Sequence, residues 1–182
     1  MLGTKDPGNP LRMKKFFIIA AALLLVCACA KDGPEQFRGD YSFKTGGSID
    51  IAGTAYSLWG LIKKDTVLTR SLIPEAGQMH IVNEAEKGKM KVTMNVMGGD
   101  PVVFSAEVDG NTLLLLPVRR IVPVAQVHDG LNVGYDLTVC GYGVCHENTV
   151  VFQLDFTGDF SFEGFDGKVI RSRANCIATR NE

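Results

Sequence analysis

The stretches KMKVTMNV (residues 89–96) and VVFSAEVDGNTLLLL (102–116) determine the fold class. In the first, methionine and valine alternate with lysine, threonine and asparagine, a period of two residues that is typical of a half-buried β-strand. In the second, two apolar runs flank Asp109-Gly110-Asn111, whose glycine and asparagine accept the positive φ angles of a tight turn. Together the two stretches predict three consecutive antiparallel strands.

Outward from this hairpin, similar short runs predict further strands at 48–51, 78–83, 133–139, 149–156 and 167–179. Turn residues separate the runs at short intervals, so we expect neighbours in the sequence to pair antiparallel. The stretch 58–77 fits either one more strand or a short helix that ends before Pro74.

These runs predict an all-β domain over residues 40–182, a single antiparallel meander of about eight strands. A meander of this length hides its edges by closing into a small barrel or, alternatively, by folding into a β-sandwich. The strand 167–179 places Ser172, Ala174, Cys176 and Ala178 on one face. Small residues on that face either leave a cavity or make room for nearby phenylalanines, and we favour the filled interior; the phenylalanines are Phe152, Phe156, Phe160 and Phe162.

The start of the chain has the pattern of an export signal. After Met13, two lysines precede an apolar run at 16–26, which is too short to span a bilayer but has the length of a secretory signal core. The polar residues before Met13 fit no part of such a signal, so we expect translation to start at Met13. Residues 1–28 are therefore the predicted signal peptide.

The end of this run, VCAC (26–29), resembles the lipobox of bacterial lipoproteins, in which small or aliphatic residues precede an acylated cysteine. Cys29 is the predicted lipidation site, because Cys27 follows a bulky valine. Ordinary signal peptidase cleavage after Ala30 is the alternative. Acyl chains on Cys29 would hold a domain on a membrane without a spanning helix. Residues 29–39 are then a lipidated N-terminus and a short flexible tether.

A family resemblance extends this interpretation. Lys31-Asp32 is similar to the signal that directs Bacteroidetes lipoproteins to the outer leaflet of the outer membrane. The lipobox, this signal, and short strands with G-x-G (141–143) and G-N-T (110–112) turns resemble Bacteroidetes lipoproteins that carry a calycin-like (lipocalin-like) β-barrel domain. The resemblance implies a lipid-anchored protein of the outer membrane, exposed at the cell surface, with a barrel that is packed or holds one small apolar ligand.

Three cysteines remain after export, Cys140, Cys145 and Cys176. A hairpin loop at 141–144 would place Cys140 and Cys145 at disulfide distance. A turn at 146–147 would instead leave both on one strand, where no bond between them forms. Cys140 with Cys145-His146 would be a zinc pattern only with a distant fourth ligand, His80 or His128, and we predict no metal and no cofactor.

No motif of a catalytic site is present, so the sequence predicts no enzyme. An acidic run, Asp155, Asp159, Glu163 and Asp166, would suit calcium or a hydrolase, but its residues alternate with phenylalanines or lie beside glycines in turns, as solvent-facing residues do. Asp65-Thr66-Val67 resembles the O-glycosylation acceptor of exported Bacteroidetes proteins and predicts Thr66 on an exposed loop.

The charge of the chain argues against a nucleic-acid partner. The 182-residue chain has a net charge of −1, and it contains no basic block of the kind that binds nucleic acid.

We expect a non-catalytic binding module for a small apolar ligand, a glycan or a partner protein. A structural accessory subunit of an envelope complex, with a packed barrel, is the alternative, and a hydrolase the distant one.

Overall fold

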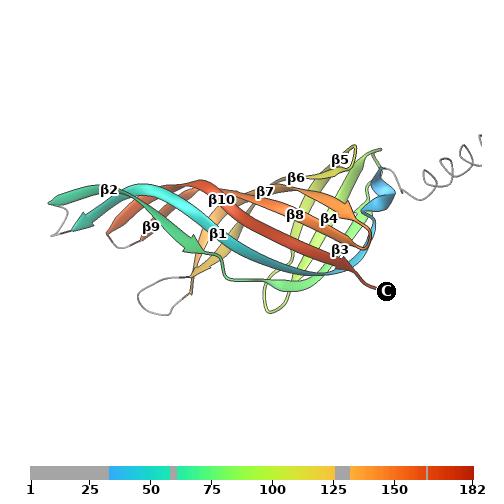
Figure 1. Ribbon diagram of the computed structural model, residues 1–182, viewed down its shortest axis with the longest axis horizontal. Coiled ribbons are helices and arrows are strands. Elements are labelled where there is room, and N and C mark those ends of the chain that lie inside the picture. Colours follow the sequence, from blue (N-terminus) through green and yellow to red (C-terminus); the bar gives the residue numbers. More distant parts are fainter. Residues whose placement is uncertain (1–32, 58–60, 126–131, 163) are drawn as a thin grey trace, which may run out of the picture. The chain divides into compact units, whose positions relative to one another are not determined.

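The computed structural model describes residues 33–57, 61–125, 132–162 and 164–182, all within one compact unit, Asp32–Glu182. This part of the chain begins with a short 3-10 helix and continues as ten antiparallel strands (Figure 1). The elements are η1 (Pro34–Gln36), β1 (Gly39–Ser57), β2 (Ile62–Ser71), β3 (Ala76–Asn83), β4 (Lys89–Val96), β5 (Val102–Asp109), β6 (Thr112–Ala125), β7 (Asn132–His146), β8 (Thr149–Thr157), β9 (Asp159–Phe162) and β10 (Phe165–Arg180).

Eight of the ten strands form a closed ring. The order in the sheet is β2-β1-β3-β4-β5-β6-β7-β8-β10-β9, and the pairing of β1 with β10 closes the ring. β2 and β9 lie outside it, because β2 pairs with Ser48–Ser57 of β1 and β9 pairs with Phe165–Lys168 of β10. The predicted all-β antiparallel meander is confirmed, and it closes on itself instead of forming a sandwich. Each of the eight predicted strand ranges falls within one ring strand.

The alternation that predicted the strands also sets which side chains face inward. On β4, Met90, Val92 and Met94 are buried, and Lys91 between them is exposed. On β10, Ala174, Cys176 and Ala178 are buried as predicted, and so are Phe152, Phe156 and Phe160 on β8 and β9. One apolar core therefore fills the ring.

The structure corrects three details. Residues 62–71 form strand β2, so the helix alternative for this part of 58–77 is wrong; 58–60 lie outside the described residues. β9 was not predicted. The G-x-G at 141–143 is not a turn but lies within β7, and the turn that follows is at Glu147–Asn148.

The glycines of β7 serve packing instead. Gly143 is paired with Phe152 of β8, and a Cβ atom at Gly143 would lie 2.5 Å from the Phe152 ring. The absence of a side chain at Gly143 thus provides the space that the inward ring of Phe152 needs.

Candidate functional site

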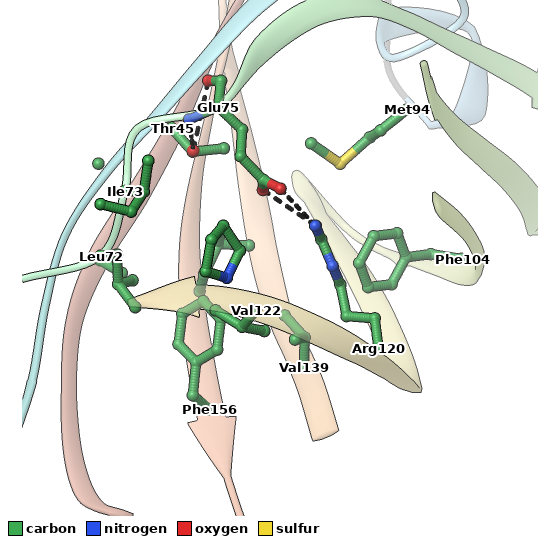
Figure 2. Close-up of a pocket in the computed structure, with 14 residues that line it drawn as sticks. Thr45, Leu72, Ile73, Glu75, Met94, Phe104, Arg120, Val122, Val139 and Phe156 are labelled. Carbon is green, nitrogen blue, oxygen red and sulfur yellow. Dashed lines mark hydrogen bonds and ion pairs between the residues drawn. The ribbon is translucent and has the colours of Figure 1, made fainter. Parts of the chain in front are cut away.

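Along one edge, β1 pairs first with β3 and then with β2, and we call the place where the partner changes the seam. β1 pairs with β3 up to Lys44 and with β2 from Ser48 onward, and the chain crosses between these partners at Leu72–Glu75. At this seam the backbone N–H of Thr45 donates to the carbonyl of Glu75 at 2.7 Å, and the N–H of Glu75 donates to the Thr45 hydroxyl at 2.9 Å. These bonds hold the Glu75 backbone beside the ring (Figure 2).

An ion pair lies across the seam. Arg120 of β6 donates to both carboxylate oxygens of Glu75, from Nη1 to Oε2 at 3.0 Å and from Nη2 to Oε1. Both side chains are largely buried, beside the apolar side chains of Met94, Phe104 and Val122 (Figure 2). A two-point contact between arginine and carboxylate is geometrically specific, but its net energy is small, because both charges have left water.

The space beneath this pair is nearly filled. The cavity there has a volume of about 20 Å³, enough for a single water molecule. Pockets that hold small ligands usually measure about 300–1,000 Å³. Cys176 is buried in the same interior, where burial, and secondarily the charge of Glu75, raises the pKa of its thiol to about 12. A buried thiol of this kind is unreactive near neutral pH.

The residues that precede β1 pack against the core at the other end of β3. Phe37, which follows η1, is 0% exposed. Its carbonyl accepts a hydrogen bond from the Tyr41 hydroxyl at 2.7 Å, and Arg180 Nη2 donates to the carbonyls of Gln36 (2.8 Å) and Arg38 (3.1 Å). We call residues 34–38 the plug.

Arg180 ties the plug to the last strand. Its Nη2 also donates to the Tyr41 hydroxyl at 2.8 Å, and burial raises the pKa of Tyr41 although the arginine acts in the opposite direction. Within the described part of the chain, Arg180 Nε is the buried side-chain nitrogen that has no hydrogen-bond partner.

The predicted tether, 29–39, is described only from Gly33 onward. In that part Pro34–Gln36 form η1 and Phe37 is buried, whereas Glu35 and Arg38 are exposed. Cys29, the predicted lipidation site, lies outside the described residues. Sequence reasoning missed the plug because Phe37 is a single apolar residue in a polar stretch, without periodicity.

The cysteines follow the second of the two arrangements considered. Cys140 and Cys145 both lie on β7, paired with Asp155 and Val150 of β8, and both are free thiols, as is Cys176. The hairpin loop that would have joined Cys140 to Cys145 is not formed, so the structure contains no disulfide between them.

The two histidines that the structure describes lie on different strands. His80 on β3 contacts Asp40 on β1, with 2.6 Å between Nδ1 and Oδ1, His146 ends β7, and His128 lies outside the described residues. Within the described ranges, no group of three or more His, Cys, Asp or Glu residues is placed to hold a metal ion.

The three described residues of the acidic run are exposed. Asp155 is exposed on β8, Asp159 pairs with Lys168 at 3.6 Å, and Asp166 accepts a hydrogen bond from the Ser161 hydroxyl at 2.5 Å. Glu163 lies outside the described residues.

The predicted glycosylation site is on a strand. Thr66 lies half-buried in β2, paired with Gly53 of β1, and not on an exposed loop. Its neighbour Asp65 accepts a hydrogen bond from the Thr54 hydroxyl at 2.9 Å, so this part of β2 is held to β1 by side chains as well as by the sheet.

No described helix is both long and apolar enough to cross a membrane. Comparison with known proteins gave no match: no protein-family model, no curated protein and no solved structure is significantly similar to the chain.

Proposed function

We propose that this chain is a lipid-anchored protein of the bacterial outer membrane, held by Cys29, whose calycin-like domain is a non-catalytic binding module for a partner protein. The observation that carries the choice of partner is the filled interior, with its cavity of about 20 Å³. Since this cavity among the described residues is too small for a ligand, we expect the binding groups of the module to lie on the outside of the ring.

On the outer surface, the free edge of β2 is best suited to bind a partner protein. In the described sheet β2 pairs with β1 only, and the single bridge between Leu72 and Val124 comes directly after β2 ends. An unpaired edge can accept a partner's strand by continuing the sheet. Val67 on this strand is 59% exposed, which gives a partner strand an apolar side chain to pack against.

The test is photo-crosslinking in the native cell envelope. A photoreactive amino acid at Val67 should give one discrete protein adduct, and the same residue at Lys91, exposed on β4 within the ring, should not. Equal adducts at both positions would refute binding through β2.

Native mass spectrometry of the protein from its own membrane tests the rest of the proposal. An acylated Cys29 and no retained small molecule are expected. A mature chain that starts at Lys31 without lipid would refute the anchor, and a retained apolar ligand would refute binding by the exterior.

The filled interior also favours a second function, that of a structural accessory subunit. The two functions differ in the lifetime of the complex with the partner. A structural subunit would stay bound to its partner through purification, whereas a binding module would exchange it.

A further inference from the structure

The plug fixes where the anchor leaves the domain. Cys29 lies four residues before Gly33, which lies beside Lys87 and Asn111 at the plugged end. Four extended residues span at most about 14 Å. If Cys29 is acylated, as the proposed function requires, the plugged end of the ring stays within about this distance of the bilayer surface.

A face without charge adjoins this end. We define the uncharged face as eight outward side chains in two rows across β6, β7, β8 and β10, as the strand registers place them. The rows are Thr112, Val144, Val151 and Ile177, and Leu114, Tyr142, Gln153 and Asn175. None of the eight carries a carboxylate, ammonium, guanidinium or imidazole group.

The face begins directly at the plugged end. Thr112 follows the turn that accepts a hydrogen bond from Gln36 of the plug, on the carbonyl of Gly110. The four strands lie side by side in the ring (Figure 1). The large apolar side chains Leu114, Tyr142, Val151 and Ile177 are 38–47% exposed, so they contact both the sheet and the surroundings.

The other side of the ring differs in charge. The outward side chains of β3 and β4 include His80 and Lys91. On the uncharged face, charged side chains lie only at the borders, where Glu107 pairs with Leu114 and Lys44 pairs with Ile177. Bringing β3 and β4 against a bilayer would remove charges from water, which is costly, whereas β7 and β8 at the centre of the face carry none in these two rows.

The size of the uncharged face favours the bilayer over a partner protein as the surface that it contacts. Strand spacing and residue rise give it an area of roughly 200 Å². A stable protein interface buries about 800 Å² on each partner, so the face is too small to hold a protein by itself. A surface to which the chain is already tethered needs far less, because the tether makes contact effectively intramolecular.

We propose that, in the acylated protein, the uncharged face lies against the bilayer that holds the anchor. The domain then leans on β6, β7, β8 and β10, with Tyr142 at the level of the headgroups, where amphipathic aromatic rings are favoured.

The experiment uses the full acylated protein in phosphatidylcholine vesicles that contain a lipid with a photoreactive diazirine near its headgroup. Peptide mapping should show labels on the peptides of β7, β8 and β10 at least fivefold above those on β4. Ile177→Lys should reduce labelling of the face about tenfold, and Thr93→Lys, a matched change on the outward face of β4, should leave it unchanged.

The outcomes separate the two proposals. Labels on the N-terminal lipopeptide alone would overturn the lipid-facing role and leave the anchor intact. Equal labelling of β4 and β8 would overturn it as well, because it would indicate free tumbling. Absence of acylated Cys29 would overturn the proposed function itself. Circular dichroism of both variants checks that they remain folded.

Discussion

Replacing Phe37 with alanine tests whether the plug belongs to the fold. The Phe37 side chain is 0% exposed and belongs to the apolar core, so its removal leaves a cavity at the end of the ring. The hydrogen bond from Tyr41 is to the Phe37 carbonyl and survives the substitution. Burial of this kind is worth about 3–5 kcal/mol for phenylalanine to alanine. For a domain of this size the melting temperature should fall by roughly 6–20 °C.

The assay is thermal unfolding of the purified protein followed by far-ultraviolet circular dichroism. Glu35→Ala is the matched control in the same short helix, because it removes only exposed contacts, a hydrogen bond from Asn83 and an ion pair with Arg38, and should cost no more than about 1 kcal/mol. The melting temperature of Phe37→Leu should lie between those of Phe37→Ala and Glu35→Ala. If Phe37→Ala unfolds at the temperature of Glu35→Ala, residues 33–39 are a free tether and the reasoning is wrong.

Three further predictions follow from buried groups. Arg120→Met should destabilise the domain by about 3–5 kcal/mol in urea unfolding, because it leaves Glu75 buried without its partner, and adding Glu75→Gln should restore part of the loss; equal losses in the single and double variants would contradict a coupled pair. At pH 8, Cys176 should resist alkylation by iodoacetamide until the protein is unfolded, since its thiol pKa is raised to about 12, and peptide mapping that finds it labelled first would refute its burial. The hydrogen bond from the Thr69 hydroxyl, aided by two arginines of β10, lowers the pKa of Asp50, so its contribution to stability is present above its ordinary pKa and is lost as the pH falls through the lowered value. Asp50→Asn should therefore reduce stability at pH 7 and flatten its acid dependence, and an unchanged acid profile would argue against this linkage.

The ring strands were predictable because each has its own alternating pattern. In β4, every second residue from Met90 to Met94 is buried, and a strand with one wet face shows this signal without knowledge of its neighbours. β9 has only four residues, too few for a pattern. β1 was predicted at 48–51 and extends over 39–57, because the glycines at 46 and 47 interrupt the pattern although the sheet continues through them.

The candidate site was less predictable, because its contacts join residues far apart in the chain. Glu75 and Arg120 are separated by 45 positions, and each alone is an ordinary charged residue. The burial of Phe37 was equally unpredictable, since one phenylalanine in a polar stretch forms no periodic pattern. For such residues burial and pairing are properties of the closed ring, and only the assembled strands reveal them.

The position of the Glu75–Arg120 pair explains why a costly group lies in an apolar interior. An apolar pair of similar volume would stabilise the domain as well or better, so net energy does not account for it. At the seam, however, the chain leaves β2 and enters β3, and a slip of one residue there would move Met79 and Ile81 from the core to solvent. Burial of Met79 and Ile81 already opposes such a slip, and the two-point contact between Arg120 and Glu75 opposes it further because its geometry allows only one placement of Glu75. We therefore expect the pair to reinforce the register of β3 where β1 exchanges neighbours.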